Sequence, residues 1–180
     1  MYPFFRAIIR GIIANRQPKI DFLATTTTRM WIGPFDIDPW LELNNGRTLT
    51  LYDLGRIPHF QRTGTTKPIL KAGMYLTVAG VSVRYRGRIR PFTTVEMRTR
   101  VLGWDDRFVY VEQSLWQNGD CANQMLLRQV IVKPGQGIVD PKEVADLVGV
   151  DPESPVLPEW VINWIEADAT RPWPPENAHR

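Results

Sequence analysis

Hydrophobic and polar positions change their spacing several times along the chain, and each change marks a predicted element. The first 16 residues place their apolar side chains on one helical face, which predicts an amphipathic helix over residues 1–17. Residues 20–33 are rich in β-branched and aromatic types and predict a strand that ends at Gly33-Pro34. From Asn44 the spacing becomes helical to about Gly64, with Pro58 expected to end or bend the helix.

Four long strands are predicted after this helix. Their apolar residues alternate with polar ones, and turn residues separate them, of which Asn118-Gly119 is the strongest hairpin signal. The predicted strands cover residues 75–88, 94–104, 108–117 and 121–133. Two short helices, at residues 140–150 and 157–169, and a proline-rich tail complete the chain.

This order of elements predicts the fold class. Four consecutive strands pair as antiparallel hairpins, and the only long helix must cover one face of their sheet. We therefore expect an α+β hot-dog fold, with an antiparallel sheet of about five strands wrapped around one long central helix. A single domain is expected over residues 1–180, with the hot-dog core at 18–134 and C-terminal helices and tail at 135–180.

Composition mainly excludes classes of function. The chain has 180 residues, and its net charge of +3 gives little electrostatic footprint for nucleic acid. The single cysteine, Cys121, excludes an internal disulfide, and the two histidines, His59 and His179, are far apart. We therefore expect no metal site.

The N-terminal segment carries arginines between its apolar residues. It is too short and too charged to span a bilayer, and it lacks the layout of a signal peptide, so a cytoplasmic location is expected. The favoured interpretation is a helix that docks its apolar face on the protein's own body or on a second subunit. The alternative is peripheral membrane contact through residues 1–16.

Polar residues gather where the first strand leads into the central helix. Asp36-Ile37-Asp38 is followed by Asn44-Asn45-Gly46, and Arg56 comes later in the helix. Taken alone, either aspartate is explained as a turn cap, Asn44 or Asn45 as an N-cap, and Arg56 as half of an ion pair. The same residues and spacing resemble hot-dog thioesterases of the 4-hydroxybenzoyl-CoA type. The string ELNNGRTLTLYDLGR and the opening MYPFFR are most similar to the "thioesterase superfamily member six" branch.

The resemblance implies an acyl-CoA thioesterase in which Asp38 attacks the thioester or activates water. Backbone N–H groups of Asn45 and Gly46 are suited to hold the oxyanion. Further site predictions are Glu42 as an alternative base, and Asn44, Arg47 and Arg56 as substrate contacts. No cofactor is implied beyond coenzyme A as part of the substrate, and an acyl carrier protein thioester is an alternative. A homodimer or tetramer is expected, with its sites between protomers.

Three positions depart from the pattern of the resembling family. Glu42 stands where many members have histidine, Thr48 where tyrosine is common, and Leu54 where a helix acid often lies, next to Asp53. The alternative function is therefore a non-catalytic acyl-CoA or acyl-chain binding protein of the same fold. A hot-dog dehydratase ranks lower because it would need a histidine near the corner.

Overall fold

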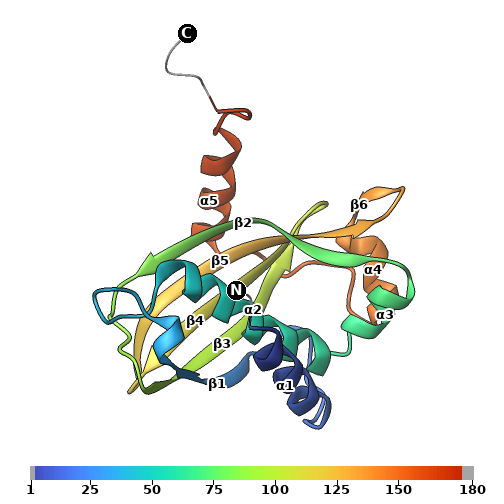
Figure 1. Ribbon diagram of the computed structural model, residues 1–180. Helices are drawn as coiled ribbons and strands as arrows, with labels where there is room; N and C mark the ends of the chain where they lie inside the picture. Colours follow the sequence, from blue (N-terminus) through green and yellow to red (C-terminus); the bar gives the residue numbers. More distant parts are fainter. Residues whose placement is uncertain (1–2, 176–180) are drawn as a thin grey trace.

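A six-stranded antiparallel sheet wraps around one long helix, α2, in the computed structural model, which describes residues 3–175 (Figure 1). This arrangement confirms the predicted hot-dog fold. The elements are, in chain order, α1 Phe4–Asn15, β1 Thr26–Ile32, the 3₁₀ turn Pro34–Asp36, α2 Asn45–Arg62, α3 Thr66–Lys71, β2 Tyr75–Tyr85, β3 Thr93–Trp104, β4 Val109–Gln117, β5 Asp120–Lys133, β6 Gly137–Val139, α4 Pro141–Val148 and α5 Glu159–Ala169.

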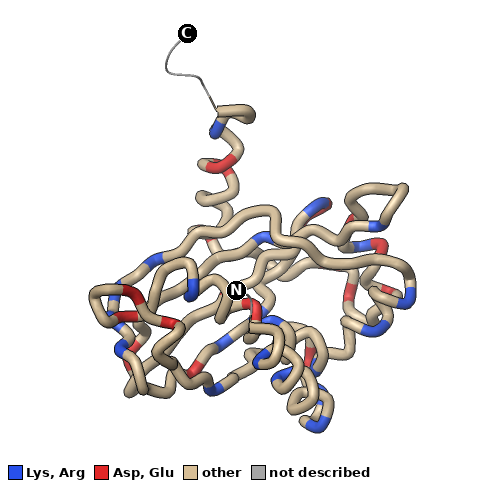
Figure 2. Tube along the Cα trace, in the orientation of Figure 1, with Lys and Arg blue, Asp and Glu red and all other residues tan. Residues whose placement is uncertain are grey.

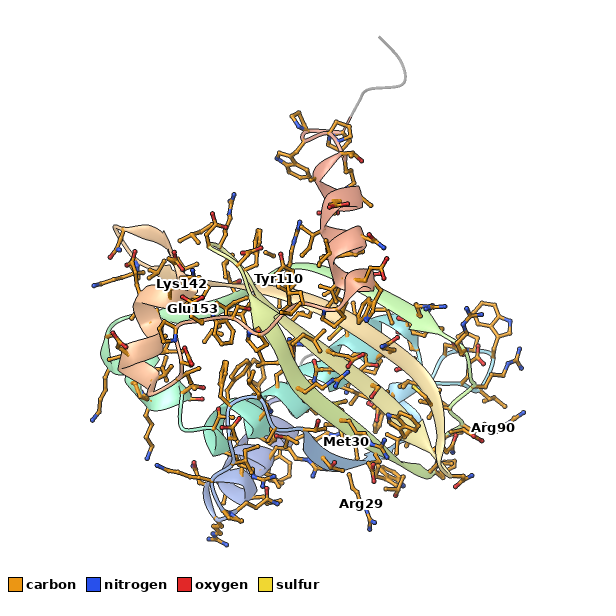
Figure 3. The ribbon with its side chains drawn as sticks, turned by 180° about the vertical axis from the view of Figure 1, so that it is seen from behind. Arg29, Met30, Arg90, Tyr110, Lys142 and Glu153 are labelled. Carbon is orange, nitrogen blue, oxygen red and sulfur yellow. The ribbon has the colours of Figure 1, made fainter. Side chains whose placement is uncertain are left out.

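The strands follow the order β1-β3-β4-β5-β2, and the short β6 also pairs with β5. Alternate residues of β1 face the core, so Met30 is buried whereas its neighbour Arg29 projects outward (Figure 3). The β4–β5 hairpin turns at Asn118-Gly119, both with positive φ, as the sequence predicted. At the far end of the sheet β2 has β5 as its only strand partner within residues 3–175.

Helix α2 lies directly on the inner face of the sheet. Leu51, Tyr52 and Leu54 are fully buried there. Gly55 is the point of closest approach, since a Cβ at this position would overlap the Met97 side chain of β3. The core therefore holds α2 in a single position against the strands.

Helix α1 covers the free edge of β1 with its arginines. Arg6 Nη2 donates to the carbonyl of Trp31 (2.8 Å), and Arg10 Nη2 donates to the carbonyl of Arg29. The two arginines are four residues apart on a helix, a rise of about 6 Å, and their two acceptors are two residues apart on a strand, a rise of about 6.7 Å. Because these rises are similar, the two arginines reach alternate carbonyls of the edge. One edge of the sheet is thereby protected from pairing with another chain.

The orientation of α1 corrects one expectation from the sequence. Ala14 and Gly11 are buried, while the six apolar residues at positions 4, 5, 8, 9, 12 and 13 are exposed. Docking of the apolar face on the protein's own body, one of the two expected arrangements, is therefore wrong, whereas docking on a second subunit stays a prediction. The physical reason is that small residues allow α1 to approach α2 closely, and the edge carbonyls of β1 require donors, which the arginines supply.

Other differences are local. Pro58 lies inside α2 instead of ending it, because burial of Gly55, His59 and Phe60 around it outweighs the lost hydrogen bond. The first strand begins at Thr26, where pairing with β3 begins, and not at residue 20.

The sequence did not predict α3 and β6, while both C-terminal helices are confirmed. The last five residues of the predicted tail, 176–180, lie outside the described residues. Within 3–175, no helix is long and apolar enough to cross a membrane.

Candidate functional site

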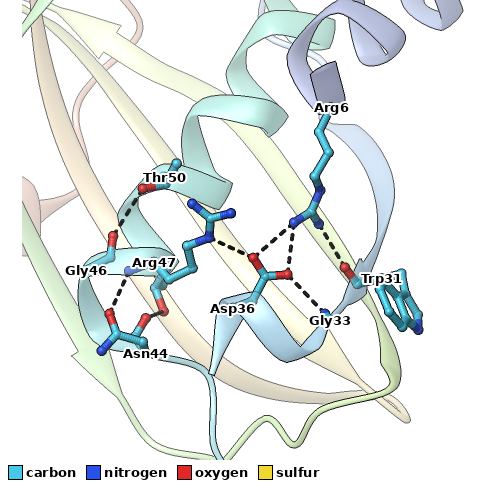
Figure 4. A network of polar contacts seen from close by, with 9 residues as sticks. Arg6, Trp31, Gly33, Asp36, Asn44, Gly46, Arg47 and Thr50 are labelled. Atoms are coloured by element: carbon cyan, nitrogen blue, oxygen red, sulfur yellow. Dashed lines mark hydrogen bonds and ion pairs between the residues drawn. The ribbon is translucent and has the colours of Figure 1, made fainter. Parts of the chain in front are cut away.

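Asp36 is the buried acid of the corner between β1 and α2, and it is 2% exposed. Its carboxylate accepts from Arg47 Nε (2.7 Å), from Arg6 Nη1 (2.9 Å) and from the backbone N–H of Gly33 (3.0 Å) (Figure 4). Burial raises the pKa of Asp36, but the bonds from Arg47 and Gly33 and the charge of Arg6 outweigh it, so the pKa lies below its usual value. Asp36 therefore stays ionised and joins α1, β1 and α2.

Asp38 lies two residues further, in a half-buried turn. Its Oδ1 accepts from the backbone N–H of Trp40 (2.9 Å) and, more weakly, from that of Glu42 (3.4 Å). Its own N–H donates to the carbonyl of Glu42 (2.9 Å), which closes the loop. Asp38 thus makes the turn contacts expected of a capping aspartate and lies beside Glu42. Its catalytic role stays a prediction.

The N-terminus of α2 follows this loop. Of the two predicted N-cap residues, Asn44 and Asn45, the N-cap is Asn44, whose side chain accepts from the N–H of Arg47 (3.0 Å). A helix leaves its first N–H groups without an intrahelical acceptor, and Asn44 satisfies only the third of them. The N–H groups of Asn45 and Gly46, both exposed residues, remain available to a ligand on the positive end of the helix.

A polar pocket of about 210 Å³ lies beside this helix end. It is bounded by the loop before α2, by the turn after β2 and by β5, and its polar lining is Glu42, Asn45, Tyr85, Arg86, Arg88 and Asn123. Glu42 pairs with Arg88 (Oε2 to Nε, 3.1 Å), and Arg88 is largely exposed. The pocket therefore combines a carboxylate, amides and cationic groups at its rim.

Asn123 is a pocket residue that the sequence reading missed. It is 4% exposed on β5, and its Oδ1 accepts from the phenol of Tyr52 on α2 (2.5 Å). Burial raises the pKa of Tyr52, so the phenol stays protonated and donates. Because the side-chain oxygen of Asn123 accepts this bond, its NH₂ group is the side-chain group that can donate to a ligand. The residues are 71 positions apart, so no local motif signals the pair.

The other predicted substrate contacts lie apart from this pocket. Arg47 turns toward Asp36, and Arg56 is buried, where it donates to Gln113 Oε1 (2.9 Å) and pairs with Asp53. Burial raises the pKa of Asp53, and the charge of Arg56 opposes this effect. Arg56 borders a second groove of about 520 Å³ between α2 and β2. Within residues 3–175, no cluster of three or more His, Cys, Asp or Glu side chains could hold a metal ion.

Comparison with known proteins assigns the chain to a family. The model of the Thioesterase-like superfamily matches residues 32–165. "Protein THEM6" from Xenopus laevis is 33% identical over 166 residues, covering 91% of this chain and 78% of the relative. A "Probable thioesterase YBR096W" from Saccharomyces cerevisiae is 22% identical, with 69% of this chain and 55% of the relative covered.

Solved structures show the same fold at low sequence identity. The probable thioesterase YbaW from Escherichia coli has a TM-score of 0.64 at 13% identity, covering 68% of this chain and 95% of that one. The DHNA-CoA thioesterase from Staphylococcus aureus has a TM-score of 0.60 at 14% identity, covering 81% and 91% of the two chains. The fold, the matched family model and the relative from Xenopus agree: the chain belongs to the thioesterase-like superfamily.

Proposed function

We propose that the protein is an acyl-CoA thioesterase that hydrolyses its substrate in the pocket beside the N-terminus of α2. The observation that carries the proposal is the pocket itself, in which Glu42 and the amide of Asn123 lie beside the helix end of Asn45. Solved structures with the same fold include a DHNA-CoA thioesterase and a gentisyl-coenzyme A thioesterase, which favours a coenzyme A thioester as substrate.

The chemistry requires stabilisation of the oxyanion that forms when the thioester carbonyl is attacked. The N–H groups of Asn45 and Gly46 are the first donors, strengthened by the positive end of α2. Asn123 supplies a side-chain donor to the same pocket, and Tyr52 orients it. Because a thiolate is a good leaving group, these donors and one carboxylate are sufficient for hydrolysis.

Two carboxylates compete for the role of base or nucleophile. Asp38 occupies the position that the family resemblance assigns. It lies in the loop beside Glu42, outside the lining of the pocket, and its turn contacts described above use only Oδ1. Glu42 lines the pocket but is paired with Arg88. We propose Asp38 as the reacting group. Arg86 and Arg88 are exposed at the pocket rim, where they suit the phosphates of coenzyme A.

Replacing each carboxylate by its amide distinguishes the roles of Asp38 and Glu42. Thiol release from a panel of short, long and aromatic acyl-CoAs is expected to fall by about 100-fold in Asp38→Asn, because the reacting charge is lost. Glu42→Gln is expected to change KM more than kcat, because it releases Arg88. Asp106→Asn, on an exposed turn, serves as the matched control. Equal activity of Asp38→Asn and the parent protein would show that Asp38 is not the reacting group.

The alternative function is acyl-CoA binding without turnover. The Glu42–Arg88 pair and the turn contacts of Asp38 favour it, because both carboxylates already have partners. Calorimetric binding of acyl-CoA without thiol release across the panel would support this alternative and exclude hydrolysis.

We also propose that two copies pair through β2. On the side away from β5 this strand has no partner strand within residues 3–175, and Tyr75, Val78, Val81 and Tyr85 are exposed along it. The other sheet edge is closed by α1, so side-by-side pairing has one available direction. The groove between α2 and β2 would then lie at the interface of the two protomers.

Light scattering tests this assembly. The parent protein is expected to have the mass of a dimer or of a dimer of dimers. Val78→Lys with Val81→Lys is expected to shift it toward monomer, because like charges would face each other across the pair. The same two lysines placed at Ile138 and Val156, which are exposed elsewhere, should leave the mass unchanged. A monomeric parent would refute the proposal.

A further inference from the structure

Helix α1 presents an unusual apolar surface to solvent. Phe4, Phe5 and Ile8 are 69%, 76% and 61% exposed, and Ile9, Ile12 and Ile13 continue the surface along the helix. The helix is 12 residues long, so this surface extends for about 18 Å. Contiguous exposed apolar residues on this scale are typical of a binding surface.

The exposed surface is not needed to hold α1 in place. The opposite side of the helix makes the attachment, through buried Gly11 and Ala14 and through the arginine bonds to β1. Gly11 lies close to Gln61 of α2, because a Cβ at this glycine would be 3.1 Å from the amide nitrogen of Gln61. Phe5 and the four isoleucines of this surface are therefore exposed to a partner.

Charge identifies the chemistry of that partner. Residues 3–20 contain four cationic residues and no acid, and Asp21 follows. Arg6 and Arg10 are bonded to β1 on the opposite side, so Arg16 and Lys19 are the cations left beside the exposed surface. Figure 2 shows Lys and Arg positions along α1 and at the turn that follows it. Arg16 and Lys19 are exposed, as is Arg29 on the adjacent strand. A second copy packed on this surface would bring like charges together, whereas an anionic bilayer would neutralise them.

Exposed aromatic residues adjoin the first turn of α1. Arg6 is bonded to the carbonyl of Trp31 and to Asp36, so the first turn of α1 is linked to the segment that carries Trp31 and Phe35. Both of these aromatic residues are exposed, and the ring of Trp31 lies 6.2 Å from that of the exposed Phe92. Amphipathic aromatic rings such as that of tryptophan favour the boundary between headgroups and acyl chains.

We propose that α1 is a peripheral membrane-binding helix, which lies flat on an anionic phospholipid bilayer with its exposed Phe and Ile residues in the acyl boundary. Arg16, Lys19 and Arg29 contact the headgroups at its side. The helix stays attached to the sheet through Arg6 and Arg10 in this state, because those bonds use the opposite side. The proposal does not depend on the activity of the pocket.

Flotation with lipid vesicles tests the proposal on the full chain. The protein is expected to float with vesicles of phosphatidylcholine containing about one third phosphatidylglycerol, and much less with phosphatidylcholine alone. High salt should weaken binding, because it screens the headgroup charge. Ile8→Gln with Ile12→Gln is expected to reduce the bound fraction by at least about tenfold, since two side chains no longer enter the apolar layer.

A matched control uses the same chemistry elsewhere. Ile138→Gln with Val156→Gln also replaces exposed apolar residues, outside α1, and should bind vesicles like the parent protein. Thiol release from a water-soluble acyl-CoA should be equal in the parent protein and in both double variants. Two results would overturn the proposal: no flotation of the parent protein, or equal flotation of the α1 variant and the parent. If the parent does not float and the α1 variant has a lower mass in light scattering, the surface is assigned to contact between copies.

Discussion

Asp36→Ala is expected to lower the free energy of unfolding by about 3 to 5 kcal/mol. The substitution leaves Arg6 and Arg47 without their shared carboxylate and frees the N–H of Gly33. The loss is large because the side chain of Asp36 is only 3% exposed and the two arginines are partly buried with it. Denaturant unfolding followed by circular dichroism measures the change.

The control for this prediction is Asp106→Ala. Asp106 is an exposed turn residue, and its replacement should change the free energy of unfolding by no more than about 0.5 kcal/mol. A double-mutant cycle with Arg6→Ala should give a coupling energy that differs clearly from zero, because the two side chains are in direct contact. Additive effects in the cycle, or a loss at Asp36 no larger than at Asp106, would contradict the bridging role of Asp36.

Stability is expected to fall by up to about 3 kcal/mol as the pH drops from about 6.5 to about 4, through His59. The side chain of His59 is fully buried in α2, where its Nδ1 lies 2.8 Å from the hydroxyl of Thr26. Burial lowers the pKa of His59 from 6.5 to about 4. In this pH range the unfolded chain binds a proton that the folded protein excludes, so acid favours unfolding.

Thermal unfolding of the parent protein and of His59→Gln across this pH range isolates the effect. Glutamine keeps a hydrogen-bonding group toward Thr26 but does not titrate, so the slope between pH 6.5 and 4 should be clearly smaller in the variant. Asp36 contributes at lower pH, because its folded pKa is depressed and its stabilisation is lost only as the pH falls through that value. Identical pH slopes of parent and variant would show that His59 is not the group responsible.

The periodicity of the sequence by itself determined the architecture. The strand alternation, the Asn118-Gly119 turn and an N-cap at Asn44 or Asn45 are local signals, and the structure confirms all three, with Asn44 as the cap. They are reliable because backbone geometry imposes spacing and turn chemistry on residues that are near in sequence. The same local signals placed the polar corner at the start of α2, and the family resemblance selected Asp38 within it.

Tertiary structure decided which residues meet at the site. The corner contains two aspartates, and only the fold shows that Asp36 is buried between two arginines while Asp38 lies in a half-buried turn. The pairing of Tyr52 with Asn123 depends on how α2 lies against β5, because the two residues are far apart in the chain. Hydrophobic spacing specifies which side of an element is buried, but not which residues of another element it will face.

Helix α1 is the clearest case in which hydrophobic spacing did not specify what an element faces. Its spacing correctly predicted an amphipathic helix, whose apolar side was expected to pack on the protein's own body or on a second subunit. The free carbonyls of β1 instead require donors, and Arg6 and Arg10 meet that requirement. The need to satisfy a sheet edge arises only when the strands have assembled, so the direction in which the helix faces was decided by the tertiary structure.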